Sequence, residues 1–485
     1  MNIQSIMPTK DASIYYQGIK YNFETIYYYS ELINKILRRI CKNRSCIVGL
    51  MIPRSVWQVY CILGTLKSGN VYVPINVSLP QNRIEYILNH SEAQLLLIDK
   101  KIYEKLTIFS NFEIISSLNN NIWILQRKNS AFISEMELSQ LAYIIYTSGT
   151  TGVPKGVAIR KESLYNLQSA FKRKIGCREN ETIVSLADYS FDMFIPEGIL
   201  SLSYGMTVIL SDTKDIINPR KIIKTLMEYC PEYIQITPSA LRLIYFVEKD
   251  FECFRSLKAL LVGAESFPKE LFETLKAKFT GEIYNLYGPT ESTVWCTCAR
   301  LTNENEIHIG KELDGCEIKI LKHEGIEANE NEIGEIVIFG IQIAAGYWKG
   351  EKENKEKFIN FAGNIGYRSG DIGYRDHTGN IHFVGRIDDQ VKLHGYRVEL
   401  LEIENTMKKD PYIINAAIGI KGEGISQRLI AFLMIKEGFE QKKFIQFLKD
   451  QLPPYAIPSK LIYVSEMEYN INGKTDRKKM TEIYA

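Results

Sequence analysis

The sequence predicts an α/β fold, and two patterns carry this prediction. Short apolar runs recur along the chain, and the segments between them space their apolar residues as helices do. Strands that alternate with helices form largely parallel, buried sheets with helices on their faces. Residues 316–384 differ, because short strand-like runs separated by glycine-containing turns predict a small antiparallel sheet or barrel there.

The expected elements follow in chain order. A helix is expected over 30–40, where apolar residues share one face and Ser30 can act as the N-cap. Buried strands are expected at 46–52, 71–75, 94–99, 141–146, 207–210, 233–236 and 259–264. The antiparallel region is expected to hold strands at 316–321, 335–340 and 380–385. Residues 349–358 are predicted to form a solvated helix or loop, and a mixed α/β pattern returns after Asp388.

The composition is that of a globular protein of several domains. The 485 residues are 45% hydrophobic, and 59 Lys and Arg against 57 Asp and Glu give a net charge of +2, which does not indicate a nucleic-acid partner. The N-terminus shows no targeting pattern, and no run of about 18 apolar residues occurs. Nine Cys and six His are scattered without metal-ligand spacing, and Cys296 and Cys298 form an isolated pair. We therefore expect a cytoplasmic protein with buried, reduced thiols, structural histidines and no membrane partner.

A glycine- and hydroxyl-rich loop follows the strand expected at 141–146, and residues 147–156 read TSGTTGVPKG. Glycines let backbone N–H groups approach a phosphate closely, hydroxyls donate hydrogen bonds, and a lysine neutralises charge. The loop is not of the Walker A type, because its second glycine is not followed directly by Lys and Ser or Thr. The candidate phosphate-binding residues are Thr147, Ser148, Gly149, Thr150, Thr151, Gly152 and Lys155.

This loop resembles the signature loop of the AMP-forming, adenylate-forming superfamily, which includes acyl-CoA synthetases, luciferases and the adenylation domains of nonribosomal peptide synthetases. Further matches follow in the family's order at 66–75, 285–291, 334–336, 346–348, 367–371, 385–399, 452–458 and 472–474. The resemblance implies a large N-terminal AMP-binding domain over 1–387, with two α/β subdomains and a small β-barrel-like subdomain. It also implies a small, mobile α+β C-terminal domain over 388–485, with a hinge near Asp388.

The same resemblance implies ATP and Mg²⁺ as cofactors. Attack of a carboxylate on the α-phosphorus builds negative charge, so the site needs cations. Lys474 is expected to bridge the carboxylate and the α-phosphate, and Glu291 to bind Mg²⁺. Asp371 is expected to hold the ribose hydroxyls, and Tyr287 to offer its ring to the adenine. The full set of implied nucleotide contacts outside the glycine-rich loop is Ala264, Glu265, Ser266, Asn285, Leu286, Tyr287, Gly288, Thr290, Asp371 and Arg386.

The substrate class follows from one acidic residue. Asp192 falls where amino-acid-activating members carry an Asp that pairs with the substrate ammonium, a charge that activators of fatty or aryl acids do not need. A helix N-cap is the structural alternative for this residue. The family's pocket positions correspond to Asp192, Met193, Pro196, Gln235, Leu261, Gly263, Leu286, Val294, Trp295 and Lys474. This set resembles the glycine pattern, from which Met193 and Pro196 depart, so glycine is favoured over D-alanine or L-alanine.

A second half-reaction is implied after adenylation. The resemblance to stand-alone adenylation domains and D-alanine–carrier-protein ligases implies transfer to the phosphopantetheine thiol of a separate carrier protein, with Lys392 brought to the site by rotation about Asp388. No carrier signature follows Lys474, so the acceptor is expected to be another chain or coenzyme A. His394 and Leu401 depart from the family's hinge motif. An acyl-CoA synthetase and a catalytically silent scaffold are the alternative functions.

Overall fold

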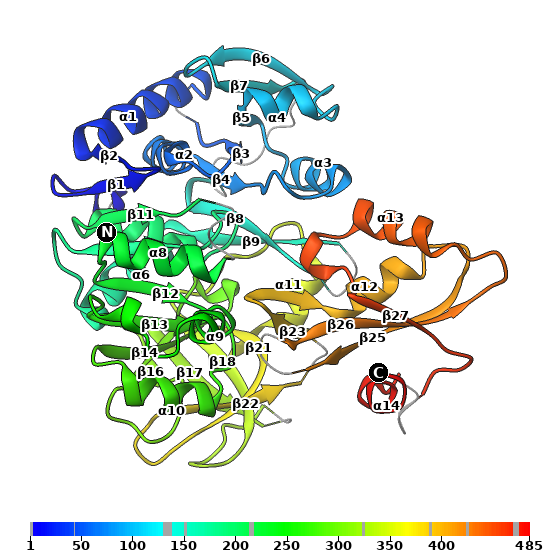
Figure 1. The fold of residues 1–485 in the computed structure, drawn as a ribbon. Helices are drawn as coiled ribbons and strands as arrows, with labels where there is room; N and C mark the ends of the chain where they lie inside the picture. Colours follow the sequence, from blue (N-terminus) through cyan, green and yellow to red (C-terminus); the bar gives the residue numbers. More distant parts are fainter. Residues whose placement is uncertain are drawn as a thin grey trace. The chain divides into compact units, whose positions relative to one another are not determined.

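The computed structural model describes residues 3–42, 44–129, 138–149, 153–212, 218–322, 325–387, 390–422, 426–468 and 475–485. The chain separates into two compact units. The first comprises Met1–Val77, Leu88–Tyr146 and Gly156–Ile387, and the second comprises Ser78–Ile87, Thr147–Lys155 and Asp388–Ala485. Both units mix helices and strands (Figure 1), so the predicted α/β class is confirmed.

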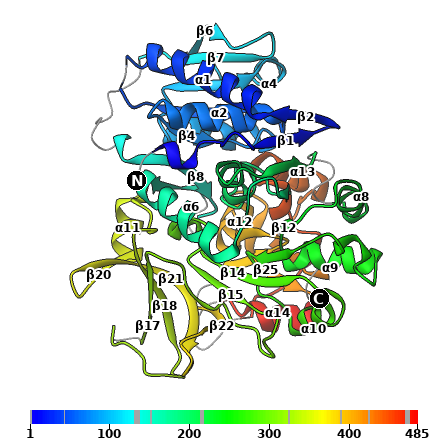
Figure 2. The same ribbon diagram turned by 90° about the vertical axis from the view of Figure 1, so that its left-hand side faces the viewer.

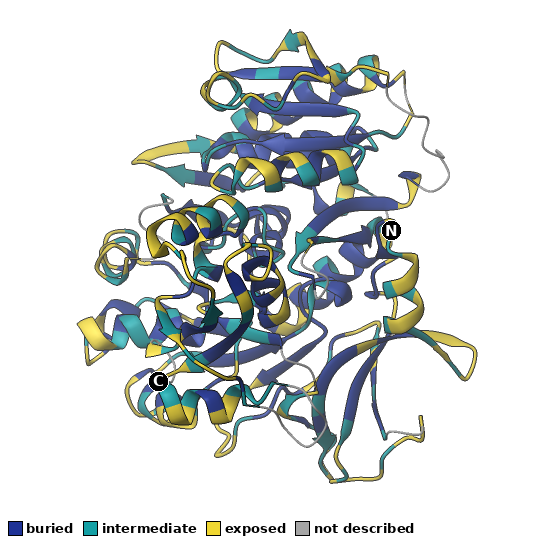
Figure 3. Ribbon diagram, turned by 90° about the vertical axis from the view of Figure 1, so that its right-hand side faces the viewer, coloured by how far each residue is buried: buried dark blue, intermediate teal, exposed yellow. Residues whose placement is uncertain are grey.

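An eight-stranded sheet in the first unit has the order β19-β9-β8-β4-β3-β5-β7-β6. Its strands are β3 (Ile47–Met51), β4 (Val71–Pro74), β5 (Leu95–Asp99), β6 (Phe112–Ser117), β7 (Ile122–Arg127), β8 (Leu141–Thr147), β9 (Lys155–Arg160) and β19 (Gly346–Tyr347). Four of them occupy runs predicted as buried strands, and β3 pairs in parallel with both β4 and β5. These central strands are buried (Figure 3), because residues of α1 (Phe23–Ile40) and α2 (Val56–Lys67) pack with them in one apolar core.

The predicted start of the first long helix is wrong. The helix α1 begins at Phe23, and its N-cap is Asn22, whose Oδ1 accepts a hydrogen bond from the Thr25 N–H at 3.1 Å. Ser30 is buried within the helix. The apolar face extends through the aromatic stretch before Ser30, so tertiary packing continues the helix past a residue that can cap one.

A nine-stranded sheet forms the rest of the α/β core of the first unit, in the order β16-β15-β14-β13-β12-β10-β11-β1-β2. Its strands are β1 (Ser13–Tyr16), β2 (Ile19–Asn22), β10 (Thr182–Ser185), β11 (Thr207–Leu210), β12 (Tyr233–Ile236), β13 (Ala259–Gly263), β14 (Glu282–Tyr287), β15 (Thr297–Arg300) and β16 (Lys311–Glu312). The strands from β14 to β1 in this order pair in parallel. Their carboxyl ends therefore meet at one edge of the sheet, where open α/β folds bind ligands.

The two faces of this sheet belong to different cores. Ile234, Leu260 and Ile283 pack in one apolar cluster with α8 (Pro219–Tyr229), α9 (Pro238–Val247) and α10 (Lys269–Lys278), which Figure 2 shows beside β12 and β14. Leu261 and Leu286 alternate onto the opposite face and belong to the larger cluster that also contains the eight-stranded sheet. Side chains on the same face as Leu261 therefore point into this larger core.

The antiparallel region forms an open sheet. Its strands are β17 (Cys316–Leu321), β18 (Gly334–Gly340), β20 (Phe358–Phe361), β21 (Asn364–Arg375) and β22 (Ile381–Arg386). The order is β17-β18-β21-β20, and β22 pairs with β21. The strands predicted here are confirmed, but the barrel-like closure is not, because β17 and β20 remain edges among the described residues. The predicted solvated segment holds α11 (Glu351–Lys357), which has no buried residue.

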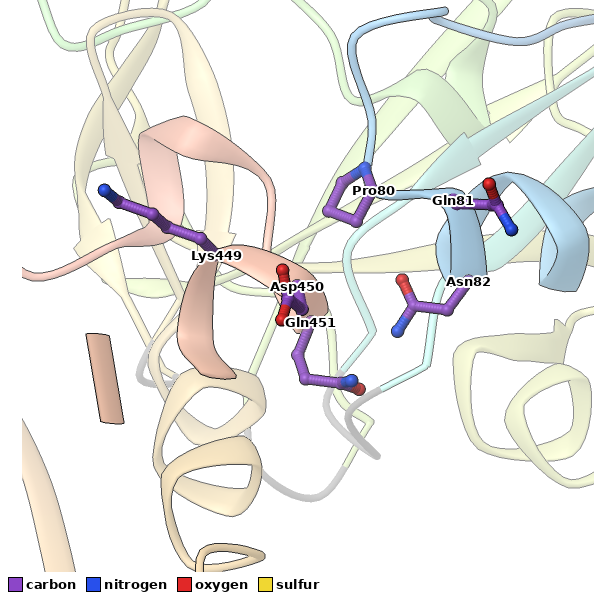
Figure 4. Close-up of a pocket in the computed structure, with 6 residues that line it drawn as sticks. All are labelled: Pro80, Gln81, Asn82, Lys449, Asp450 and Gln451. Atoms are coloured by element: carbon purple, nitrogen blue, oxygen red, sulfur yellow. The ribbon is translucent and has the colours of Figure 1, made fainter. Parts of the chain in front are cut away.

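The described residues of the C-terminal part of the second unit form a β-hairpin, a three-stranded sheet and three α-helices. The strands are β23 (Gln390–Leu393), β24 (Tyr396–Glu399), β25 (Ile413–Lys421), β26 (Arg428–Ile435) and β27 (Lys460–Tyr463), and the helices are α12 (Leu400–Met407), α13 (Gln441–Gln451) and α14 (Arg477–Tyr484). A pocket in this unit is lined by Pro80, Gln81, Asn82, Lys449, Asp450 and Gln451 (Figure 4), and none of these is a predicted site residue.

The remaining short elements connect these sheets. They are η1 (Ile3–Ile6), α3 (Gln81–His90), α4 (Lys100–Lys105), α6 (Lys161–Ile175), η2 (Ile195–Leu200), α7 (Ser201–Ser203), η3 (Glu252–Phe254), η4 (Thr290–Ser292) and η6 (Pro454–Ala456). Across the described part of the chain, no helix has the length and apolar character needed to cross a bilayer.

Candidate functional site

The candidate site lies at the carboxyl ends of β12, β13 and β14. Gln235 pairs in register with Leu261, and Gly263 pairs with Leu286 two residues further along. Because side chains alternate along a strand and cross-strand partners share a face, these four residues lie on the same face of the sheet. The sheet therefore brings together four of the predicted pocket residues.

Trp295 fills the space above Gly263. A Cβ on Gly263 would lie 2.6 Å from Cη2 of the indole and 2.9 Å from the carbonyl oxygen of Leu286. The indole is 1% exposed, so it packs directly on the glycine backbone. A side chain at position 263 and an indole at position 295 exclude one another in this arrangement.

The chain before Trp295 adopts an unusual backbone conformation. Thr293 and Val294 have φ of 57° and 71°, in the left-handed region that β-branched residues avoid. Such residues cost about 1–3 kcal/mol each and persist only where packing over-determines them. Here the Thr293 hydroxyl donates to the Gln342 carbonyl oxygen at 2.6 Å, and a Cβ on Gly288 would lie 2.4 Å from the Val294 carbonyl oxygen. These contacts hold Val294 and Trp295 in place.

A buried hydrogen-bond chain reaches Trp295 through Gln235. The indole Nε1–H donates to Gln235 Oε1 at 2.9 Å. Gln235 Nε2 in turn donates to the Met193 carbonyl oxygen at 3.0 Å and to Glu197 Oε1 at 2.9 Å. Glu197 Oε2 accepts the backbone N–H groups of Leu186 and Ala187, at 2.8 and 2.9 Å. The chain therefore joins the indole to the loop that follows β10.

Sequence reasoning missed Glu197, although its position carried a signal. It stands alone as a charge in the apolar stretch IPEGIL, and it is fully buried in η2. Burial raises its pKa from the ordinary 4.5 to about 7, while the hydrogen bonds it accepts and the charge of Arg54 act in the opposite direction. Arg54 is itself buried and donates to the carbonyl oxygens of Ser185, Ala187 and Ser211.

Asp192 lies just before η2 and is half-buried. It is not the N-cap of η2, because Phe194 occupies that position. Asp192 bonds to the start of η2 through its carbonyl oxygen, which accepts the Ile195 N–H at 2.9 Å. Burial raises the pKa of Tyr72 and Tyr143 well above their ordinary value, and the charge of Asp192 adds to the shift of both, after that of Tyr72 in the case of Tyr143. The carboxylate thus lies near two buried phenols and keeps part of its surface accessible.

The predicted ribose residue Asp371 is engaged by two side chains. Its Oδ2 accepts the Tyr287 hydroxyl at 2.6 Å, and its Oδ1 pairs with Arg386 at 2.5 Å. Asp371 and Arg386 face each other across β21 and β22. The Tyr287 ring is buried and lies 6.5 Å from that of Phe383. The structure therefore places Tyr287, Asp371 and Arg386 in one cluster.

The predicted metal residue Glu291 lies in η4 and is 1% exposed. Its Oε1 accepts the Tyr347 hydroxyl at 2.7 Å, and its carbonyl oxygen accepts the Ala344 N–H. Mg²⁺ in nucleotide sites is usually bound through one or two carboxylates together with substrate phosphates and water. A single carboxylate therefore fits this kind of ion, which the nucleotide would complete. Among the described residues, no group of three or more His, Cys, Asp or Glu gathers as a metal site.

The other predicted nucleotide residues of this unit surround the ends of β13 and β14. Ala264 has a φ of 67°, and Ser266 is exposed. Glu265 accepts both the N–H and the hydroxyl of Ser239, at 2.9 and 2.6 Å, and so supports the first turn of α9. The amide of Asn285 donates to the His308 carbonyl oxygen at 2.9 Å.

Several predicted residues lie elsewhere. Thr150, Thr151, Gly152, Asp388 and Lys474 fall outside the described residues. Thr147, Ser148, Gly149, Lys155 and Lys392 belong to the second unit. A Cβ on Gly149 would lie 2.2 Å from the Val153 carbonyl oxygen, so position 149 requires glycine. His394 has a φ of 51°, with its ring 3.0 Å from the Gln427 carbonyl oxygen, and Leu401 is 37% exposed.

The cysteines and histidines follow the expectations in most respects. All nine cysteines are free, but Cys230 is exposed and Cys46 and Cys316 are half-buried, so they are not uniformly buried as expected. His382 pairs with Asp376 at 2.8 Å and stacks on Tyr374 with ring centroids 4.7 Å apart.

Comparisons with known proteins identify the family. The family whose sequence model matches residues 6–348 is described as AMP-binding enzyme. Gramicidin S synthase 1 of Brevibacillus brevis is 32% identical over 451 residues, which are 91% of this chain and 40% of that protein. The chain thus spans less than half the length of this relative.

Solved structures share the fold. A Vibrio cholerae adenylation domain, AlmE, in complex with glycyl-adenosine-5′-phosphate has a TM-score of 0.84 at 20% identity, covering 99% of this chain and 96% of its own. Holo-AB3403, a four-domain nonribosomal peptide synthetase bound to AMP and glycine, has a TM-score of 0.69 at 26% identity. That match covers 98% of this chain and 35% of AB3403.

Proposed function

The chain belongs to the AMP-binding enzyme family of AMP-forming ligases, and we propose that it activates glycine as glycyl-AMP and passes it to a carrier protein. The observation that carries the choice of amino acid is the indole of Trp295, packed on Gly263 with Leu261 and Leu286 on the same face. We assign to these side chains the space that would otherwise receive a substrate side chain.

Asp192 supports the amino-acid class of substrate. A half-buried carboxylate beside two buried phenols favours a partner with a positive charge, and the substrate ammonium supplies one. A fatty or aryl acid would bring no positive charge to this half-buried carboxylate. Asp192 therefore argues against an acyl-CoA synthetase.

The packing of Trp295 on Gly263 supports glycine within that class. A methyl group that overlaps the indole must displace it, and overpacking of this kind typically costs about 1–3 kcal/mol. A hydrophobic pocket discriminates between substrates that differ by one methylene by only about 1–3 kcal/mol. Alanine in either configuration is therefore the second candidate. Pro196 in the first turn of η2 departs from the glycine pattern and keeps alanine in consideration.

Adenylation joins the two substrates with loss of pyrophosphate. A carboxylate oxygen of the amino acid bonds to the α-phosphorus of ATP, and the bond from that phosphorus to the bridging oxygen of pyrophosphate breaks. Lys474 is assigned to the charge that builds between the carboxylate and the α-phosphate, and the 147–155 loop to the β- and γ-phosphates. Glu291 would hold Mg²⁺, which supplies charge neutralisation on the phosphates when it is bound. Asp371 would hold the ribose, oriented by Tyr287 and Arg386.

Transfer to a thiol would complete the reaction. The thiol sulfur attacks the carbonyl carbon of glycyl-AMP, the bond to the phosphate oxygen breaks, and AMP leaves as the thioester forms. We assign this step to a second pose of residues 388–485, reached by rotation about Asp388, which brings Lys392 to the site. The similarity to peptide synthetases supports the phosphopantetheine arm of a carrier protein as the acceptor.

The test is ATP–pyrophosphate exchange with purified enzyme over glycine, L-alanine, D-alanine, β-alanine and serine, with octanoate and benzoate as the non-amino acids. We expect the largest kcat/KM for glycine and no exchange above background for either non-amino acid. A preference for D-alanine would move the enzyme to the carrier-protein ligase class. Exchange with octanoate, followed by thioester formation with free coenzyme A, would overturn the proposal.

A further inference from the structure

We propose that Glu197 is a specificity-determining positioning residue, which fixes the indole of Trp295 through the amide of Gln235. The inference rests on the proposed function, because it concerns how the pocket rejects substrates larger than glycine. Gln235 bonds to Glu197 through its Nε2 and to the indole through its Oε1. Glu197 therefore acts on the indole through this amide.

Each group in this hydrogen-bond chain has a donor or acceptor role that its neighbours determine. The indole N–H can only donate, and the Met193 carbonyl oxygen can only accept. Gln235 Nε2 has two acceptors, Met193 O and Glu197 Oε1, so this end of the amide must carry the hydrogens. Its Oε1 is therefore the end that faces the indole, which donates to it at 2.9 Å. A flip of the amide would place two donors face to face at Trp295.

Hydrogen bonds from the backbone also fix the Glu197 carboxylate. Its other oxygen accepts the N–H groups of Leu186 and Ala187, and the carbonyl oxygen of Ala187 accepts a hydrogen bond from Arg54. Glu197 is fully buried, while Gln235 and Trp295 are each 1% exposed, so water cannot replace a lost partner without a rearrangement. The position of the indole is thus set from a loop on the far side of Gln235.

A glutamine at position 197 cannot satisfy both of its neighbours. Its carbonyl oxygen can accept the two backbone N–H groups, but its NH₂ then faces the NH₂ of Gln235. If the Gln235 amide flips to accept from it, the indole N–H loses its acceptor. Glu197→Gln therefore breaks the chain at one point while changing the side-chain volume very little, and the indole becomes free to rotate away from Gly263.

The experiment compares wild type, Glu197→Gln, Trp295→Phe and the double variant, with Glu181→Gln as the matched control. Glu181 is also a buried carboxylate that accepts a backbone N–H, from Arg178 at 2.7 Å, but it lies at the opposite end of β10. Two quantities are measured in each protein. One is the ratio of kcat/KM for glycine to that for L-alanine in pyrophosphate exchange. The other is the hydrogen-exchange rate of the Trp295 indole N–H in protein labelled with ¹⁵N-tryptophan, whose resonance is identified by its absence in Trp295→Phe.

We expect Glu197→Gln to lower the glycine-to-alanine ratio about tenfold, mainly through a lower KM for L-alanine, and to speed exchange of the indole N–H at least tenfold. In the Trp295→Phe background, Glu197→Gln should change the ratio less than twofold, because no indole remains to be positioned. Glu181→Gln should leave both quantities as in wild type. If Glu197→Gln does not fold, Gln235→Met, which removes the acceptor of the indole, should produce the same two changes.

Three outcomes would overturn the inference. One is a ratio and an exchange rate in Glu197→Gln within twofold of wild type. Another is an equal loss of selectivity with and without Trp295, which would mean that Glu197 acts by a different route. The third is an unchanged indole exchange rate in Gln235→Met. If the wild type activates no amino acid, the proposed function fails, and the indole exchange rate still tests the positioning role by itself.

Discussion

A methyl group at position 263 tests the packing that closes the pocket. In Gly263→Ala the new Cβ would lie 2.6 Å from Trp295 Cη2 and 3.0 Å from its Cζ3, so the ring must move by about 1 Å to reach ordinary contact. The hydrogen bond from the indole to Gln235 resists that movement. We expect the free energy of unfolding to fall by about 1–3 kcal/mol, the usual cost of overpacking. We also expect kcat/KM for glycine to fall at least tenfold, because the displaced ring enters the substrate space.

The assay is a double-mutant cycle with Trp295→Phe, read by urea denaturation and by pyrophosphate exchange. Phenylalanine lacks the outer ring atoms that the methyl group would strike, so Gly263→Ala should cost less in that background, where only the contact with the Leu286 carbonyl oxygen at 2.9 Å remains. Gly385→Ala is the control for loss of a glycine, because a Cβ there meets no atom within 4 Å. An equal destabilisation by Gly263→Ala with and without the indole would refute the packing argument.

Four further predictions concern chemistry, substrate binding, domain movement and pH. Lys474→Ala should lower pyrophosphate exchange by several orders of magnitude in folded protein, and retention of more than a tenth of the rate would contradict its assigned role. Asp192→Ala should raise the KM for the amino acid and barely change that for ATP, whereas an unchanged amino-acid KM would exclude it as the ammonium anchor. Asp388→Pro should largely preserve exchange and strongly impair carrier acylation, because it fixes φ at the proposed hinge; equal losses in both would count against a hinge there. Burial raises the pKa of Glu197 to about 7, so the folded state binds this proton more tightly than the unfolded state does. The free energy of unfolding that this proton contributes is therefore lost as pH rises from 4.5 through 7. Wild type should thus lose up to about 3 kcal/mol relative to Glu197→Gln over this range, and parallel unfolding curves at pH 4.5 and 7.5 would contradict it.

The strands were the most predictable part of the fold. The runs at 46–52, 71–75, 94–99, 141–146, 207–210, 233–236 and 259–264 all form strands, because a strand buried on both faces must be apolar along its length. The start of α1 was not predictable from its capping residues, since Asn22 and Ser30 can both cap a helix and only packing selects between them. The sequence predicted a small antiparallel sheet or barrel and did not decide between them, because closure depends on which edge strands meet. The described strands β17, β18, β20, β21 and β22 form an open sheet.

The site divides in the same way. Asp192, Glu291 and Asp371 were predicted as site residues from the family's ordered motifs, and their roles stay predictions. Glu197 and Arg54 were not predicted, because their function in the pocket consists entirely of contacts with residues distant in sequence.

The sequence by itself determined the α/β class, the family and the residue types available for ATP-dependent activation, since local patterning and ordered motifs record these directly. Only the tertiary structure decided how the pocket is filled. The register of β12, β13 and β14 places Gln235, Gly263 and Leu286 on one face, and the left-handed turn at Thr293 and Val294 delivers the indole onto that glycine. The hydrogen-bond chain from Glu197 then has a single arrangement, because buried donors and acceptors must each find a partner.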